Sequence, residues 1–363
     1  DARDGRQAGG IDLRLQNLSW LRDDVAVLID ALTLEGQVQD AFGAGAAQGR
    51  LRLEGLLSPE ASVSTARFDF DGDFKALDWQ AELAAELQAP LTLSAGGTAT
   101  LAGEALDIVL ARLQGSLAGT PLGLSSPATL HLSAMRQELS GLALTVGQGR
   151  IGGGAALSAQ ALRGDLRTVA LPLAPFIAVA AGQAAEGLLD LDAGLNWTGD
   201  QPEFDLQAKA GGLRLVDESE AWPSGEVAVQ ATWRGRALAV SGTVSGITSE
   251  PGSFEASLPL LAGSEIPEMT LQPDGPLSGS LQWRGELGPL LRLLPLSEHR
   301  FRGEGLLNLG VAGSVAAPRL TGEARLIQGQ YKHLYWGTEF HNIELTADGD
   351  STGSLTMKGT ADD

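Results

Sequence analysis

Few side chains in this sequence are suited to chemistry. The chain has 363 residues with 4 His and no Cys, which rules out thiolate nucleophiles, thiolate metal ligands and disulfides. No G-x-S-x-G nucleophile elbow occurs. The acidic residues are dispersed, mostly alternating with apolar ones, so no stretch gathers the partners that acid–base or nucleophilic catalysis needs. We therefore do not expect an enzyme.

Three aspartates have the spacing that opens a calcium-binding loop. Asp69, Asp71 and Asp73 occupy alternate positions, and an EF-hand loop begins D-x-D-x-D. That loop also needs Gly at its sixth position and Glu at its twelfth, where this chain has Phe74 and Gln80. Alternation with phenylalanines explains all three carboxylates as the outer face of a strand. We favour the strand over a calcium site.

Two histidines near the C-terminal end could suggest a metal site. His333 and His341 flank Trp336 and Glu339, but they span a predicted hairpin and have no obvious third ligand. We expect no metal ion and no cofactor.

The segment from Gly147 to Gly152 formally matches the dinucleotide fingerprint G-x-G-x-x-G. In nucleotide-binding folds this motif sits inside a strand–helix–strand unit, with an acidic residue about 20 positions on. Asp165 lies near that offset, but Gly153 and Gly154 follow at once and no strand–helix–strand pattern surrounds the match. A hairpin in a glycine-rich β protein is the interpretation we favour.

The elements that would position any site are short strands with one apolar side. Leu13 and Leu15 alternate with charged residues, and Leu51 and Leu53 do the same. This pattern predicts a mostly antiparallel, repetitive and elongated all-β protein with one apolar face. Periodicity cannot decide whether that face closes on itself or lines a groove. The residues expected on it are Leu189, Leu191, Leu195, Trp197, Phe204, Leu206, Val227, Val229, Trp233, Leu281, Trp283, Leu307, Leu309, Val311, Ile343 and Leu345.

Two stretches show helical spacing instead, over residues 169–185 and 286–298. Both follow an R-G-[DE]-L sequence, 121 residues apart (163 to 284), and both precede an E-G-L-L-[DN]-L sequence, 118 residues apart (186 to 304). This predicts an internal repeat over approximately 163–283 and 284–363, the second copy being truncated. We expect the short amphipathic helices to cap the sheet; the alternative is a lid over an open apolar face.

The net charge of the chain limits the kinds of molecule that it can bind. The formal net charge is −20, which disfavours nucleic acid and anionic surfaces. Hydrophobic residues make up 43% of the chain but aromatic residues only 5%, and the 48 Gly suit many turns and bulges.

The apolar run from Val169 to Gly182 is interrupted by prolines and is too short for a transmembrane helix. We expect the chain to be a fragment whose membrane anchor lies outside it.

One stretch, residues 303–345, carries a family resemblance. It combines alternating Gly and Leu, a Pro followed by an L-x-G strand, a G-x-Y turn and a W-G hairpin. The residues that carry these features are Gly303, Gly305, Leu307, Leu309, Gly313, Pro318, Leu320, Gly322, Gly329, Tyr331 and Gly337. The pattern resembles the repeat of the TamB/AsmA-like proteins, bacterial relatives of the bridge-like lipid-transfer proteins.

The resemblance implies a fold and a function. Family members form a long, curled β-sheet, folded like a taco, whose hydrophobic groove spans the periplasm of Gram-negative bacteria. They are anchored in the inner membrane and are associated with moving phospholipid to the outer membrane, and TamB partners an Omp85-type outer-membrane barrel. By this resemblance, residues 1–363 are a fragment of one continuous groove.

Two alternatives stay open at the level of sequence. A periplasmic scaffold or chaperone for outer-membrane β-barrel proteins would use the same sheet surface. A structural β-solenoid or adhesin segment would also be repetitive, although such proteins usually show short, strict coils, and the repeat here is near 120 residues.

Overall fold

The computed structural model consists almost entirely of β-sheet, with 80% of the chain in strands. It describes residues 2–3, 6–22, 25–39, 45–59, 61–73, 75–216, 224–247, 250–263, 266–288, 299–349 and 355–362. The chain divides into two units. Unit 1 comprises Asp1–Asp190 and Leu215–Glu220, and unit 2 comprises Leu191–Arg214 and Ala221–Asp363.

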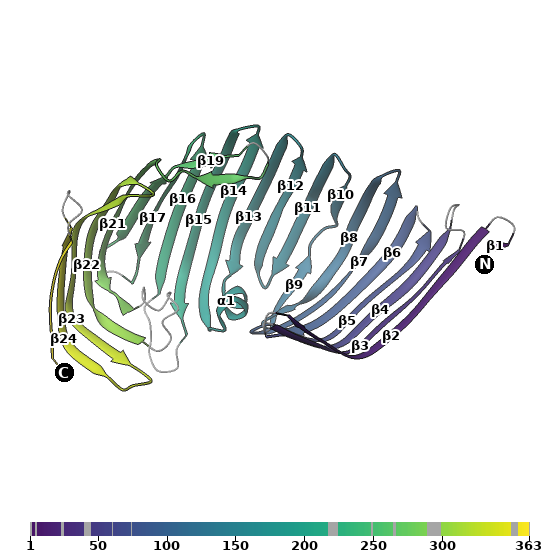
Figure 1. The fold of residues 1–363 in the computed structure, drawn as a ribbon, viewed down its shortest axis with the longest axis horizontal. Coiled ribbons are helices and arrows are strands. Elements are labelled where there is room, and N and C mark those ends of the chain that lie inside the picture. The colour runs from purple at the N-terminus through teal and green to yellow at the C-terminus, as the bar shows by residue number, and fades with distance from the viewer. Residues whose placement is uncertain are drawn as a thin grey trace. The chain divides into compact units, whose positions relative to one another are not determined.

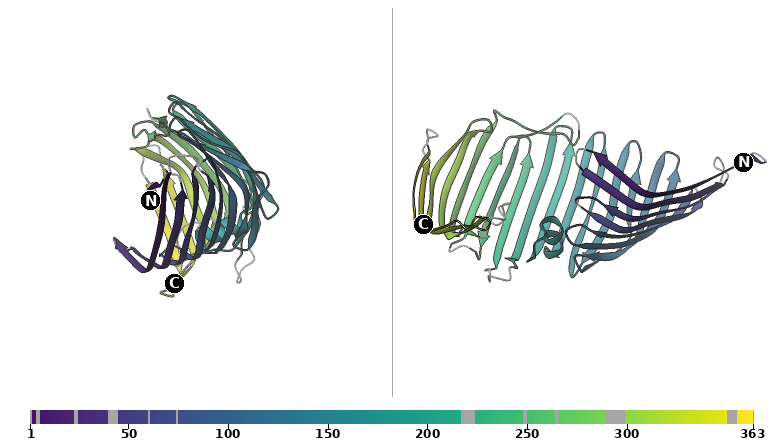
Figure 2. Two further views of the ribbon diagram at one scale, coloured as in Figure 1. Left: turned by 90° about the vertical axis from the view of Figure 1, so that its right-hand side faces the viewer. Right: turned by 60° about the horizontal axis from the view of Figure 1, so that its bottom comes forward.

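Unit 1 is a row of antiparallel strands that follow one another in sequence order (Figures 1 and 2). Its strands are β1 (Ala2–Arg3), β2 (Arg6–Arg22), β3 (Val25–Gln39), β4 (Ala46–Leu57), β5 (Ser62–Asp73), β6 (Ala76–Glu86), β7 (Pro90–Ala102), β8 (Ala105–Leu117), β9 (Thr120–Leu124), β10 (Ala128–Leu132), β11 (Arg136–Val146), β12 (Gly149–Ser158) and β13 (Ala161–Pro172). Helix α1 (Ala174–Ala181) and the first part of β14 (Ala185–Thr198) complete it.

One position in this row is shared by two short strands. The first half of β8 pairs with β10 and its end pairs with β9, and β11 pairs with both of them on its other side. The segment Ser125–Pro127 separates β9 from β10, because a proline has no backbone N–H to donate to a ladder.

Unit 2 has the same construction. It contains the rest of β14, then β15 (Gln201–Leu215) except for Leu215, and β16 (Gly225–Arg234), β17 (Ala237–Ser245), β18 (Gly252–Leu258), β21 (Pro276–Glu286), β22 (His299–Ser314), β23 (Pro318–His333), β24 (Glu339–Gly349) and β25 (Leu355–Asp362). From β15 onward each strand pairs antiparallel with the next named here. The short strands β19 (Leu260–Ala262) and β20 (Met269–Leu271) form a separate hairpin. The predicted all-β, antiparallel, repetitive fold with few helices is therefore confirmed.

Cross-strand register converts the alternating sequence into continuous apolar rows. Residues directly opposite one another in an antiparallel pair point to the same face. In unit 1 one such row runs from β2 to β8 without a charged residue: Leu13, Leu34, Leu51, Phe68, Ala81, Ala95 and Leu113. In unit 2 a row runs from β15 to β22: Ala208, Val229, Gly242, Phe254, Leu281 and Leu309.

The helix predicted over residues 169–185 is wrong at both ends. Residues up to Pro172 belong to β13, where the Ala170 N–H donates to Asp190 Oδ1 at 2.7 Å, and β14 already begins at Ala185. Helix α1 has a proline in its first turn and ends at Gly182, which has φ 62° and donates its N–H to the Ala178 carbonyl. All of its side chains are apolar, so it has no polar face and is not amphipathic.

The second predicted helix, over residues 286–298, lies mostly outside the described residues. Glu286 itself is the last residue of β21. The two R-G-[DE]-L sequences of the proposed repeat differ in placement, since Arg163 is near the start of β13 and Arg284 near the end of β21. The repeat and the single continuous groove over residues 1–363 stay predictions.

Gly97 shows how tightly the strands are spaced where the ladder is irregular. The register between β7 and β8 shifts at Gly96 and Gly97, so that Ala111 has no direct partner. A Cβ atom on Gly97 would lie 1.7 Å from the Val109 carbonyl oxygen, which no L side chain tolerates.

We predict that Gly97→Ala lowers the free energy of unfolding by about 2 kcal/mol or more, because the β7–β8 ladder must shift. Gly9→Ala on β2 is the matched control, since nothing lies within 4 Å of its Cβ position. It should change stability by less than about 0.5 kcal/mol. Urea unfolding followed by circular dichroism measures both, and equal effects of the two substitutions would contradict the close approach.

Candidate functional site

The apolar face of unit 2 brings most of the predicted site residues together. Phe204 lies opposite Trp233, while Val227, Val229 and Leu206 belong to neighbouring rows of the same ladder. Leu281 and Trp283 on β21 lie opposite Leu309 and Leu307 on β22. Val311, Ile343 and Leu345 extend the face through β22 and β24. Leu191, Leu195 and Trp197 share one side of β14, and Leu189, on the same side, falls in the part of β14 that belongs to unit 1.

Tryptophans anchor this face. Trp197, Trp233 and Trp283 are only 1%, 4% and 4% exposed, and the rings of Trp197 and Trp233 meet edge to face with centroids 5.2 Å apart. The indole N–H of Trp197 donates to the Gly199 carbonyl at 2.8 Å, and that of Trp233 donates to the Leu260 carbonyl at 3.0 Å. The indole N–H of Trp283 is buried and has no hydrogen-bond partner among the residues that the structure describes.

Apart from its tryptophans, the predicted face is half-buried rather than buried. Leu191, Leu206, Val229, Leu281 and Leu309 all retain partial exposure. Among the described residues, every strand belongs to one sheet except β19 and β20, which form a separate two-stranded sheet, and the most extensive contacts join strands that pair with each other. A β-sandwich would cover such a face with a second sheet about 10 Å away. Here no described strand layer does so.

The exposed surface area agrees with a single layer. The chain exposes 22119 Å² to solvent, whereas two separate compact domains of half its mass would together expose about 16,600 Å². The excess means that a large part of the surface that a globular protein would bury remains accessible.

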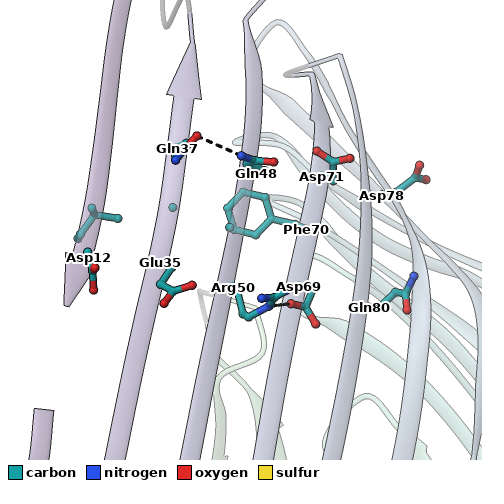
Figure 3. Close-up of a pocket in the computed structure, with 13 residues that line it drawn as sticks. Asp12, Glu35, Gln37, Gln48, Arg50, Asp69, Phe70, Asp71, Asp78 and Gln80 are labelled. Atoms are coloured by element: carbon teal, nitrogen blue, oxygen red, sulfur yellow. Dashed lines mark hydrogen bonds and ion pairs between the residues drawn. The ribbon is translucent and has the colours of Figure 1, made fainter. Parts of the chain in front are cut away.

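The opposite, polar face of unit 1 contains a shallow depression of about 640 Å³ (Figure 3). Five of its lining residues, one from each strand of β2–β6, lie directly opposite one another: Asp12, Glu35, Arg50, Asp69 and Gln80. Next to them Gln48 Nε2 donates to Gln37 Oε1 at 3.1 Å. This is an acid-rich strand surface with one arginine in its middle, and Ile11 and Phe70 also line it.

Asp69 is the one carboxylate here with a clearly shifted pKa. Its side chain accepts hydrogen bonds from Arg50 Nε at 2.5 Å and from Arg67 Nε. Partial burial raises the pKa of the Asp69 carboxyl, but the hydrogen bonds and charges of the two arginines outweigh it and hold the pKa below its usual value. The same hydrogen bond with Asp69 raises the pKa of Arg50.

The structure places the calcium-like aspartates on a strand. Asp69, Asp71 and Asp73 lie along β5, where Asp71 faces Asp78 of β6 and Asp73 accepts the backbone N–H groups of Lys75 and Ala76. Three carboxylates in a row on one strand cannot wrap around a cation as a loop does. In the described residues no group of three or more His, Cys, Asp or Glu side chains could hold a metal ion.

The structure also shows where the G-x-G-x-x-G match and the two histidines of the suggested metal site lie. Gly147 and Gln148 form the two-residue turn between β11 and β12, with Gly147 at φ 58°, so the hairpin interpretation of the G-x-G-x-x-G match is confirmed. His333 lies at the end of β23 and its Nδ1 accepts the N–H groups of Tyr335 and Trp336. His341 Nε2 lies 3.7 Å from Glu339 Oε1.

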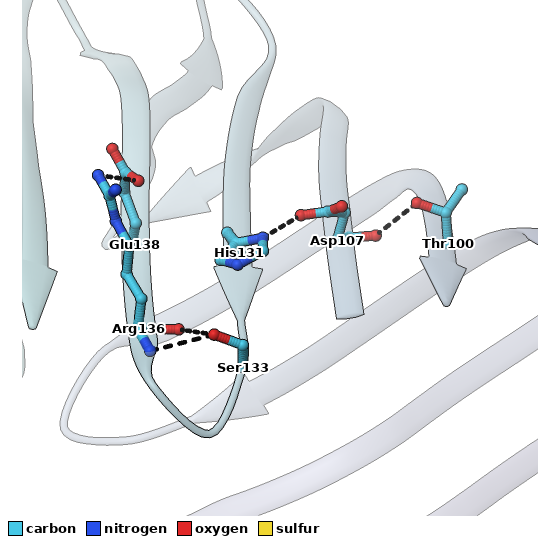
Figure 4. A network of polar contacts seen from close by, with 6 residues as sticks. All are labelled: Thr100, Asp107, His131, Ser133, Arg136 and Glu138. Atoms are coloured by element: carbon cyan, nitrogen blue, oxygen red, sulfur yellow. Dashed lines mark hydrogen bonds and ion pairs between the residues drawn. The ribbon is translucent and has the colours of Figure 1, made fainter. Parts of the chain in front are cut away.

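A histidine–aspartate pair was not anticipated from the sequence. His131 of β10 lies directly opposite Asp107 of β8, and His131 Nδ1 is 2.6 Å from Asp107 Oδ1 (Figure 4). Such a pair can orient an imidazole as a general base. The neighbouring hydroxyls are used elsewhere, since Thr100 donates to the Asp107 carbonyl and Ser133 to the Arg136 carbonyl. In the described part of the chain neither hydroxyl contacts His131, and the arrangement lacks a nucleophile.

We predict that Asp69→Asn flattens the acid dependence of stability. Because the folded pKa of Asp69 lies below its unfolded value of about 3.9, its contribution is present at neutral pH and is lost as pH falls through the folded pKa. The variant should be less stable than wild type at pH 7, and the difference should shrink below pH of about 4. Urea unfolding between about pH 7 and pH 3 measures this, and parallel curves would contradict the Arg50–Asp69–Arg67 arrangement.

No helix among the described residues has the length and apolar character to cross a membrane. Comparison with known proteins gave no match: no protein-family model, no curated protein and no solved structure is significantly similar to this chain.

Proposed function

We propose that this chain binds the acyl chains of phospholipids on the apolar faces of its sheets and carries phospholipid between the inner and outer membranes in the periplasm of a Gram-negative bacterium. The observation that carries the proposal is the uncharged row of partly exposed apolar side chains from β15 to β22, which no second large sheet covers among the described residues. Exposed apolar patches of this extent on soluble proteins usually mark a binding surface.

The energetics favour several lipids at once over a single tight site. Each fully buried methylene gains about 0.8 kcal/mol, so a chain of about 16 carbons covered on one side gains about 6 kcal/mol. A bilayer covers the same chain on all sides and therefore holds a lone lipid better than an open face does. Neighbouring lipids on the face would cover one another and remove most of this difference.

The membrane context of the proposal rests on the family resemblance. A TamB/AsmA-like protein of this kind would be anchored in the inner membrane and would meet an Omp85-type barrel at the outer membrane. The polar face suits this role, because its charged rows keep an apolar-rich chain soluble without binding nucleic acid.

Native mass spectrometry with lipid extraction tests the proposal. We expect the chain, purified from a Gram-negative host, to carry more than one phospholipid per molecule. A variant with four charges on the apolar face of unit 2 should lose them: Leu191→Asp, Leu195→Asp, Leu206→Asp and Val229→Asp.

The matched control places four charges on the opposite side of the same strands. It carries Thr198→Asp, Gln207→Asp, Gln230→Asp and Thr232→Asp, all at exposed positions. It should keep its lipid, and circular dichroism should show both variants folded. A lipid-free, stable wild-type chain would overturn the proposal and favour a scaffold for outer-membrane protein assembly.

A further inference from the structure

The hairpin between β23 and β24 presents large apolar side chains to solvent. Leu334, Tyr335 and Trp336, which we call the aromatic tip, are 45%, 79% and 74% exposed. They follow one another in the turn that ends at Gly337, which has φ 68°. Tyr and Trp combine an apolar ring with a polar N–H or O–H, the combination found where proteins meet the membrane–water interface.

Hydrogen bonds and a ring contact hold the aromatic tip. His333 Nδ1 accepts the N–H groups of Tyr335 and Trp336 at 3.3 Å each, and the rings of His333 and Trp336 stack with centroids 4.4 Å apart. The His333 N–H donates to the Thr338 carbonyl, and the Gly337 N–H donates to the His333 carbonyl, both at 2.9 Å. Because the turn is already ordered, binding through it costs little additional conformational entropy.

An aromatic cluster with one buried member, His333, supports the tip from the apolar face. His333 is 5% exposed, and its ring meets that of His299 edge to face at 4.7 Å. His299 Nδ1 lies 2.9 Å from the Tyr331 hydroxyl, and the Tyr331 ring packs on Phe301 at 4.9 Å and on Phe340 at 6.2 Å. Going from the apolar face toward the turn, the rings of Phe301 and Tyr331 come first, the two histidines next, and the exposed side chains of the aromatic tip last.

The charge around the tip is opposite to that of the chain. Three basic residues, Arg300, Arg302 and Lys332, lie on the strands beside the tip, against two acidic residues, Glu339 on β24 and Asp362 on β25, which is opposite His341; the whole chain has a net charge of −20. Arg300 and Lys332 lie directly opposite each other, and Lys332 Nζ is 3.2 Å from Glu339 Oε2. At physiological salt the Debye length is about 8 Å, so distant carboxylates are screened from a surface that touches the tip.

The size of the tip favours a membrane over a protein partner. Aromatic side chains bury about 150–250 Å² each when covered, so Tyr335 and Trp336 together offer at most about 500 Å². A stable protein interface needs about 800 Å² on each partner. Insertion of a few apolar side chains below the headgroups, with basic residues beside them, is sufficient for reversible membrane binding.

We propose that the aromatic tip docks unit 2 onto the surface of a phospholipid bilayer, with Tyr335 and Trp336 at the headgroup level and Arg300 and Lys332 facing anionic headgroups. This role does not depend on lipid being held on the apolar face, so the two proposals can fail separately.

Co-sedimentation with vesicles of phosphatidylethanolamine and phosphatidylglycerol tests the docking. We expect wild-type protein to bind, and Tyr335→Ser with Trp336→Ser to lower the partition coefficient by at least about tenfold, because both inserted rings are lost. Tyr335→Phe with Trp336→Phe keeps two aromatic rings and should keep most of the binding. Arg300→Glu should weaken binding to these vesicles but not to vesicles of phosphatidylcholine alone.

Trp20→Ser is the matched control, because Trp20 is 60% exposed on β2 of unit 1 and its sequence neighbours, residues 18–27, contain one basic residue, Arg22, and two acidic ones, Asp23 and Asp24. It should leave the partition coefficient within about twofold of wild type, and the variant with four aspartates on the apolar face should still bind vesicles. Absence of wild-type binding, or equal losses in the Trp20 and tip variants, would overturn the proposal; the first result would point to a protein partner for the tip.

Discussion

Cross-strand register is the constraint on which the rest of this structure depends. Side chains alternate between the two faces of a strand, so a shift of one residue between two neighbours would move every apolar side chain of one strand to the other face. The rows through Leu51 and Phe68 in unit 1, and through Val229 and Leu281 in unit 2, exist only because every pair of strands keeps its register. Hairpin turns such as Gly147-Gln148 and the bulge at Gly97 fix that register locally.

A single layer distributes stability differently from a globular core. Each strand is held mainly by its two neighbours, as in repeat proteins, and few side chains are fully buried. Trp197, Trp233 and Trp283 supply much of the buried apolar area in unit 2, while charged ladders such as Arg50–Asp69 tie neighbouring strands on the polar face. Exposed ion pairs contribute little individually, so backbone pairing and the apolar rows carry most of the stability.

The sequence predicted the strands and the membership of the apolar face because both depend on alternation, which is local. It did not predict features that depend on which strands become neighbours. The contact between Asp107 and His131 arises because β10 occupies part of the position beside β8. The Ala- and Leu-rich stretch after Val169 was predicted to be helical, but its first residues pair in the sheet and only Ala174–Ala181 forms a helix. The Trp336-Gly337 hairpin was expected, yet its support by His333 and His299 needed the three-dimensional register of β22 and β23.

An open face made of equivalent rows has a functional consequence. Successive positions along one row present the same kind of surface, so under the proposed function a ligand would meet little change in free energy as it passed from Ala208 and Val229 toward Leu281. A deep site would trap the ligand, whereas a uniform face allows it to move along the sheet. Selectivity then has to come from features that break this uniformity, and the aromatic cluster around His299 and Tyr331 is the clearest of these in unit 2. This cluster lies at one end of the strands, where the apolar face stops. If acyl chains lay on the rows, a polar headgroup would be placed there.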